Sequence, residues 1–295
     1  MSSSGLYQIT PNSDHGVNLN LWELQEKLNA AIDWLSTWGF SVSRTRIGQY
    51  QKFLESLVGK KLSELEYHSF MFDIGEILYI HSALCKFSDL DLRPLLADLV
   101  KGKARKGLIV GDERARNFEF ELKTAAKFLE QGYKLNLSTN ADLIATNNLG
   151  KQVLIECKRL TSKKQLKKRI KEASAQLHKK YKYCSEPLAT RGFVCLDVSN
   201  LVNPEFKVIG TDESIDASKF LGGLVDDFAN ENCDLWAGIQ DLRTWGVILC
   251  ATAPVLLNEQ LCSLARVYHV DFSVVDNSEL NTAREFINHL TRQSR

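Results

Sequence analysis

Residues 153–160 read VLIECKRL, an apolar run that ends in charged residues. A short run of this composition predicts a buried β-strand. Alternate residues of a strand point to the same face, so Glu156 and Lys158 project together, while Ile155 and Cys157 face the opposite side. Burying a carboxylate and an ammonium group is costly unless they pair with each other or bind a metal ion. The end of this strand is therefore the first candidate for a functional site.

A second carboxylate, Asp142, precedes this strand in the chain. Residues 141–146 are a further strand candidate, and the sequence NNLG at 147–150 is typical of a turn between two strands. Counting outward from residue 149, Asp142 lies seven positions back and Glu156 seven positions forward. A hairpin would thus bring Asp142 next to Glu156 and Lys158. Carboxylate oxygens are the ligands that Mg²⁺ prefers, and a lysine beside such a metal can orient or help to deprotonate an attacking water.

The helix predicted at residues 112–131, which Gly132 ends, supplies another carboxylate. Glu121 lies within the apolar face of this helix, whereas Glu119 lies on the other side, alongside Lys123. A carboxylate on an inward face requires a partner, and the cluster on the neighbouring strands would provide one.

A strongly basic helix is predicted at residues 162–181. Between Lys158 and Lys182 the chain carries eleven Lys or Arg and one acidic residue, so this segment has a charge of 11 − 1 = +10, and the rest of the chain has 1 − 10 = −9. Gln176 lies at the edge of the apolar stripe of the helix, within reach of the same cleft. A charge run is often only a solvated face, but this one directly follows Lys158 and suits nucleic-acid phosphates. The residues assigned to nucleic-acid contact are Lys163, Lys164, Lys167, Lys168, Arg169 and Lys171.

Together these motifs resemble the PD-(D/E)XK nuclease superfamily, and especially its restriction-endonuclease-like and archaeal Holliday-junction-resolvase-like members. The resemblance covers residues 115 to about 200. The motifs that carry it are, in chain order, Glu121, Gly132-Tyr133, Ala141-Asp142-Leu143-Ile144, Ile155-Glu156-Cys157-Lys158-Arg159 and Gln176-Leu177. Alanine stands at position 141, where the superfamily name has proline.

The resemblance implies a four-stranded mixed core sheet flanked by helices, and a metal-dependent reaction. It implies that Asp142, Glu156 and the main-chain carbonyl of Cys157 bind Mg²⁺, for which Mn²⁺ would substitute, and that Lys158 handles the nucleophilic water. It further implies that Glu121 supports the metal shell and that Gln176 serves substrate binding or site geometry.

The expected activity is that of an endodeoxyribonuclease, which hydrolyses phosphodiester bonds in DNA. Cores of this kind cut one strand per site, so cutting both strands needs two protomers, and a homodimer is therefore considered. Two other classes stay open. One is a catalytically inactive nucleic-acid-binding protein with a nuclease fold, and the other is a structural or regulatory protein in which the cluster is a buried ion network.

The rest of the chain predicts an α/β protein of two parts. Residues 1–105 form a helical N-terminal domain, joined by the basic stretch 101–107 to a nuclease-like domain at 106–295 with a mixed central sheet. Further strands are expected at 133–137, 192–198, 247–251 and 270–275, and further helices at 217–229 and 280–290.

Composition excludes several other classes. Hydrophobic residues make up 44% and charged residues 25% of the 295 residues, which is typical of a globular protein. The seven cysteines form no CxxC pair, which argues against a zinc ribbon or a disulfide framework and favours a reducing, cytoplasmic setting. The first fifteen residues do not resemble a signal peptide, and the longest apolar stretch, 247–257, is interrupted by Pro254. No membrane partner is expected.

Overall fold

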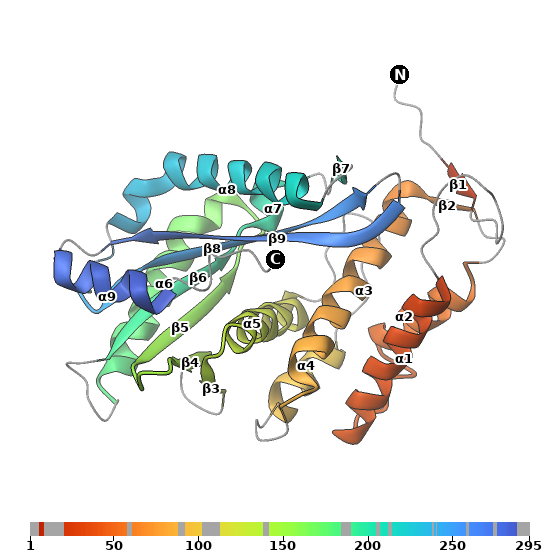
Figure 1. The fold of residues 1–295 in the computed structure, drawn as a ribbon, viewed down its shortest axis with the longest axis horizontal. Helices are drawn as coiled ribbons and strands as arrows, with labels where there is room; N and C mark the ends of the chain where they lie inside the picture. Colours follow the sequence, from red (N-terminus) through yellow and green to blue (C-terminus); the bar gives the residue numbers. More distant parts are fainter. Residues whose placement is uncertain are drawn as a thin grey trace.

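The structure is a computed structural model, and its helices and strands divide into a helical N-terminal region and an α/β region (Figure 1). The residues that it describes are 6–8, 21–57, 61–87, 92–101, 113–137, 142–183, 190–204, 207–211, 214–237, 239, 241–257, 260–273 and 276–287. The N-terminal elements are β1 (Leu6–Gln8), α1 (Leu21–Thr37), α2 (Arg46–Glu55), β2 (Lys61–Ser63), α3 (Glu64–Leu84) and α4 (Arg93–Lys101). The elements that follow are α5 (Glu113–Glu130), β3 (Lys134–Asn136), β4 (Leu143–Thr146), β5 (Gln152–Arg159), the 3₁₀ turn η1 (Lys163–Gln165), α6 (Leu166–Tyr181), β6 (Arg191–Asp197), α7 (Ser199–Val202), β7 (Ile209–Thr211), α8 (Ser214–Ala237), β8 (Thr244–Leu257), β9 (Gln260–Phe272) and α9 (Asn277–Ile287).

A mixed seven-stranded sheet forms the centre of the α/β region. Its strand order is β3-β4-β5-β6-β8-β7, and β9 also pairs with β8. The hairpins β3–β4, β4–β5 and β8–β9 are antiparallel, whereas β5, β6 and β8 run parallel to one another. The prediction of an α/β fold with a mixed central sheet and helical flanks is thus confirmed.

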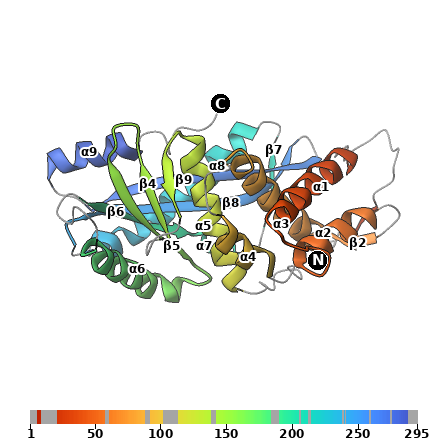
Figure 2. The same ribbon diagram turned by 90° about the horizontal axis from the view of Figure 1, so that it is seen from below.

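Helices cover both faces of this sheet. On one face, α6 and α8 pack their apolar side chains against β5, β6 and β8. On the other face, α5 and α9 do the same. The opposite side of α5 joins the core of the N-terminal helices, so α5 lies between the sheet and α3 and α4 (Figures 1 and 2). The expected division into domains at residue 105 stays a prediction, and most of the basic stretch 101–107 lies outside the described residues.

The strand predicted from VLIECKRL is β5, and its two faces differ as the alternation requires. Ile155 and Cys157 belong to the core under α5, whereas Leu154 belongs to the core under α6. Glu156 therefore shares the α6 side of the sheet with Leu154. The predicted hairpin with β4 is also confirmed, since Leu143 pairs with Ile155.

The last two strands are longer than predicted: the one predicted at 247–251 lies within β8, and the one predicted at 270–275 overlaps only the end of β9. In place of strands at 247–251 and 270–275, β8 and β9 form one long antiparallel hairpin that reaches past the sheet to α3 (Figure 1). The helix expected at 217–229 is likewise longer, extending over Ser214–Ala237. The helix expected at 280–290 begins earlier, at Asn277.

Pro254, which interrupts the apolar run 247–257 as a candidate membrane span, does not interrupt strand β8. Two residues earlier, the amide of Thr252 donates to Ser199 Oγ at 2.9 Å, on the side of β8 between β6 and β7. Since alternate amides of a strand point the same way, the missing N–H of Pro254 faces this gap, and no ladder bond is lost.

The polar side of α5 is buried, which differs from its expected place outside the packed face. Glu119 and Lys123 are 3% and 4% exposed, because the N-terminal helices cover them. Glu119 pairs with Arg46 at 2.7 Å, and Lys123 pairs with Glu76 at 2.5 Å. Each of these charged side chains of α5 is thus paired with an opposite charge from the N-terminal helices. This pairing allows α5 to be enclosed on both sides, although its sequence is that of an ordinary amphipathic helix.

None of the described helices combines the length and the apolar character that crossing a bilayer requires.

Candidate functional site

The candidate site lies where β5 extends beyond its neighbour β4. The pairing of the two strands ends at Leu143 and Ile155, and among the described residues no strand continues it. The next part of β5 therefore pairs on one side with β6 and leaves its other edge open, between α5 and α6. An open edge presents main-chain N–H and C=O groups that need partners.

Asp142 supplies one of these partners. It stands one residue before β4, and continuing the register of the hairpin places it opposite Glu156, as the count from the turn predicted. Its Oδ2 accepts a hydrogen bond of 2.8 Å from the main-chain amide of Cys157. Because the amide and carbonyl of a strand residue point the same way, the Cys157 carbonyl also faces this open edge.

Three oxygen atoms surround the ammonium group of Lys158. Its Nζ donates to Glu156 Oε1 at 2.7 Å and to the carbonyl oxygen of Cys157 at 3.0 Å, and it lies 3.9 Å from Asp142 Oδ2. These oxygens belong to the three groups that the family resemblance implies as metal ligands. They converge on a single positive charge, and in this structure that charge is the lysine.

Glu156 is held by a second ammonium group as well. The carboxylate is 1% exposed, and its Oε2 accepts from Nζ of Lys180 on α6. Two charge-assisted contacts offset the cost of burying this carboxylate. They also fix its orientation toward the open edge of β5.

Glu121 approaches the same cluster from α5. Burial, together with the nearby carboxylate of Asp142, raises the pKa of Glu121 to about 8, although Lys158 partly opposes this rise. Burial and the carboxylate of Glu156 also raise the pKa of Asp142. For Lys158, burial disfavours the charge, but the carboxylates of Glu156 and Asp142 outweigh it and raise the pKa. The site thus gathers three carboxyl groups, two of them with raised pKa values, beside Lys158 and Lys180.

A groove of about 460 Å³ opens beside this cluster, between α5 and α6. Glu121, Lys158 and Gln176 all line it, so three of the five predicted catalytic side chains face one space. The other residues that line the groove are Asn117, Phe120, Cys157, Arg159, Arg169, Glu172 and Ala175. Gln176 is exposed here, which leaves its amide accessible from the groove.

Of the six residues predicted to contact nucleic acid, Arg169 lines the groove. The five lysines are exposed on η1 and α6. Some of this charge is paired on the surface, since Lys163 contacts Glu231 at 3.3 Å and Arg169 contacts Glu172 at 3.0 Å. Exposed pairs of this kind are weak, so their cations stay available to a phosphate.

The chemistry of the donor set fits a hard divalent cation. Within the described part of the chain, no three side chains of His, Cys, Asp or Glu form a metal-binding group by themselves. The fit rests instead on the carboxylates of Asp142 and Glu156 and on one main-chain carbonyl, and oxygen donors of this type suit Mg²⁺ or Mn²⁺. The ammonium group of Lys158 lies among these three oxygen donors in the structure.

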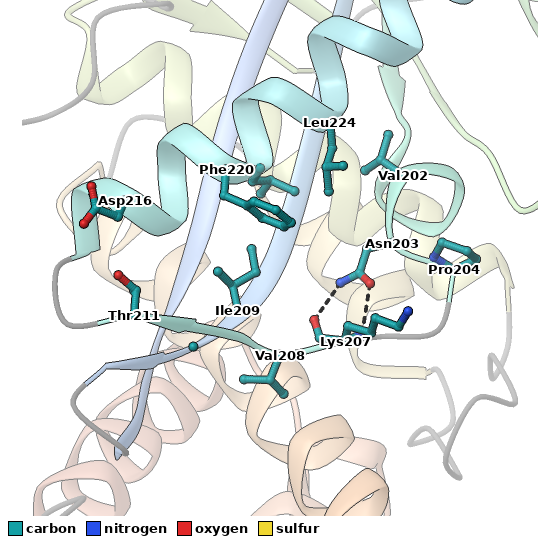
Figure 3. Close-up of a pocket in the computed structure, with 12 residues that line it drawn as sticks. Val202, Asn203, Pro204, Lys207, Val208, Ile209, Thr211, Asp216, Phe220 and Leu224 are labelled. Atoms are coloured by element: carbon teal, nitrogen blue, oxygen red, sulfur yellow. Dashed lines mark hydrogen bonds between the residues drawn. The ribbon is translucent and has the colours of Figure 1, made fainter. Parts of the chain in front are cut away.

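A second pocket, of about 600 Å³, lies between α7, β7 and α8 and contains none of these residues. Figure 3 shows its lining, in which Phe220 and Leu224 of α8 face Ile209 of β7. Asn203 and Lys207 close one end, where the side-chain amide of Asn203 donates to the Lys207 carbonyl and accepts from the Lys207 amide. This pocket is mainly apolar and is separate from the cluster at β5.

Two residues of the site, Lys180 and Arg159, were not predicted from the sequence to belong to it. Lys180 was counted only among the charges of the basic helix, although it follows Gln176 by four positions and so shares its helix face. Arg159 was part of the strand motif and of the charge count but was given no role in the site, yet it lines the groove. The spacing from Gln176 was a usable signal for Lys180, whereas the position of Arg159 depends on where β4 ends.

Comparison of the chain with protein-family models, with characterised proteins and with solved structures gave no match. Function is therefore inferred from the residues of the site.

Proposed function

We propose that the protein is a magnesium-dependent nuclease of the PD-(D/E)XK type that hydrolyses phosphodiester bonds in DNA. The observation that carries this proposal is the convergence of Asp142, Glu156 and the Cys157 carbonyl on one cation position. A sheet of mixed direction with α5 and α6 on opposite faces is compatible with a restriction-endonuclease-like core. Purely structural ion pairs do not require an open groove beside them, and this cluster has one.

Each residue of the cluster would have its own role in the proposed hydrolysis. Asp142 and Glu156 would hold the metal with the Cys157 carbonyl, and when bound the metal supplies positive charge to the scissile phosphate and acidifies water. When the metal occupies the space between these three oxygens, Lys158 would move aside and hold the attacking water at its Nζ. Lys180 keeps Glu156 oriented from the α6 side. Glu121, at the edge of the cluster, supports the site through its carboxylate.

Charge on the surface favours approach of the DNA along α6. This helix and η1 carry the exposed lysines, whereas the adjacent helix α8 carries exposed acidic residues. These acidic residues are Asp216, Asp226, Asp227, Glu231 and Asp234. Phosphates are attracted by α6 and repelled by α8, so the DNA strand to be cut would pass over the groove between α5 and α6.

A cleavage panel tests the proposal. The purified protein is incubated with linear, supercoiled, single-stranded and branched DNA and with RNA, in Mg²⁺, Mn²⁺ or Ca²⁺. Cleavage of at least one DNA in Mg²⁺ or Mn²⁺ is expected. Lys158→Met and Glu156→Gln should abolish it, whereas Lys179→Met and Glu231→Gln, which remove exposed charges of the same sign elsewhere, should not. Circular dichroism establishes that each variant is folded.

The outcomes separate the proposal from its rivals. Binding of DNA without cleavage in any metal would favour a non-catalytic nucleic-acid-binding protein and would overturn the assignment of an enzyme. Cleavage by Lys158→Met at the rate of the wild type would also overturn it. If neither DNA nor RNA binds, the cluster is a structural ion network. A cut product whose amount depends on the square of the protein concentration would support a homodimer.

A further inference from the structure

Arg159 is a buried cation at the rim of the groove with incomplete pairing. It is the last residue of β5 and is 8% exposed, yet it lines the groove together with Lys158 and Glu121. Its Nη1 has no hydrogen-bond partner among the residues that the structure describes. Its carboxylate partner on the neighbouring strand does not complete the pairing.

That partner is Asp197, which lies opposite Arg159 on β6. Its Oδ2 is 3.5 Å from Nε of Arg159, so the contact is made by the inner nitrogen of the guanidinium group. Its other oxygen, Oδ1, accepts from both the amide and the hydroxyl of Ser199, at 3.0 Å and 2.6 Å. Ser199 thus anchors Asp197, and Asp197 holds Arg159 by Nε, which leaves the outer end of the guanidinium fork without a carboxylate.

A buried guanidinium with an unpaired nitrogen is unfavourable unless a ligand completes it. The planar fork of arginine matches two oxygens of a phosphate or carboxylate. The groove holds two further cations, Lys158 and Arg169, and the amides of Gln176 and Asn117, together with the acidic residues Glu121 and Glu172. Three cations against two acidic residues leave the groove able to pair an anion with several oxygens, and a nucleic-acid strand presents one such group at every nucleotide.

We propose that Arg159 binds a backbone phosphate of the nucleic-acid strand that occupies the groove, next to the phosphate that is cut. This inference rests on the proposed nuclease function, because it takes the strand to lie in that groove. Asp197 is a positioning residue in this scheme. It holds the guanidinium by Nε and leaves the outer end of the group for the phosphate.

The test is the salt dependence of DNA binding, measured without cleavage in Ca²⁺. A short fluorescein-labelled oligonucleotide, single-stranded and as a duplex, is titrated with wild type, Arg159→Gln and Arg159→Lys between about 50 and 200 mM salt. Loss of one phosphate contact reduces the slope of log K against log salt by about 0.7 for a single strand or about 0.9 for a duplex. Arg159→Gln should show this reduction, and Arg159→Lys, which keeps the charge, should show less of it.

Lys134→Gln is the matched control, since it removes an exposed positive charge on β3, away from the groove. Thermal melting of each variant, without DNA, separates a loss of stability from a loss of contact, because partial unfolding lowers the binding-competent fraction without changing the slope. An unchanged slope for Arg159→Gln in a wild type that binds and cuts DNA would overturn this inference alone. If the wild type binds neither oligonucleotide, the inference and the proposed function fall together.

Discussion

Glu121→Gln should stabilise the metal-free protein, and increasingly so as the pH rises. Burial and the neighbouring Asp142 raise the pKa of Glu121 from 4.5 to about 8. Below pH 4.5 the residue is protonated in both the folded and the unfolded chain, so the substitution changes little. Between 4.5 and about 8 the unfolded chain loses this proton while the folded protein keeps it, which progressively favours unfolding. Glutamine removes that penalty.

The size of the effect follows from the same two values. A difference between 4.5 and about 8 corresponds to at most about 5 kcal/mol, and relaxation and solvent screening reduce it to about 2–3 kcal/mol. Urea unfolding in EDTA, at several pH values between about 5 and 9, measures the free energy of unfolding of both proteins. Glu285→Gln removes an exposed carboxylate on α9 and controls for the loss of one charge. A difference between Glu121→Gln and wild type that does not change with pH would refute the reasoning.

Three further substitutions test the site and its support. Lys180→Met removes one of the two ammonium groups on a buried carboxylate and should lower the free energy of unfolding by about 1–3 kcal/mol, measured in urea, whereas the exposed neighbour Lys179→Met should change it little. Arg116→Met breaks a buried ion network between α5 and α3 and should cost about 3–5 kcal/mol in the same assay. Gly246→Ala places a methyl group against the main chain of β9 and should lower the melting temperature, whereas Gly210→Ala meets open space and should not.

The β4–β5 hairpin could be predicted because its determinants are local. Strand alternation separates Glu156 from Cys157, and the turn at 147–150 sets the register that brings Asp142 to the site. Neither step needs knowledge of the rest of the fold. The same holds for the start of the basic helix after Lys158.

Buried charge explains much of what could not be predicted. Glu119 and Lys123 have the sequence signature of a solvated helix face, and their partners come from distant parts of the chain. Arg266 similarly interrupts the apolar alternation of β9, because it pairs with Glu76 of α3 at 3.1 Å. Ion pairs between elements far apart in sequence leave no periodic signal, so the burial of α5 on both sides and the full length of β9 became evident with the tertiary structure.

Two lysines of α6 illustrate the same limit at smaller scale. Lys179 and Lys180 are adjacent and chemically identical, yet Lys180 reaches Glu156 whereas Lys179 is exposed. The rotation of α6 against the edge of the sheet decides between them. Composition and spacing indicate that this helix carries cations, and packing determines which of them belongs to the site.

The most direct test of the central claim is the rate of Mg²⁺-dependent DNA cleavage by the wild type and by Asp142→Asn, measured side by side on the DNA that the wild type cuts fastest. Asparagine keeps an oxygen that can accept from the Cys157 amide, so the change isolates the negative charge. A loss of about 100-fold or more is predicted, because this charge holds the metal that stabilises the reacting phosphate. Equal rates for the two proteins would contradict the account.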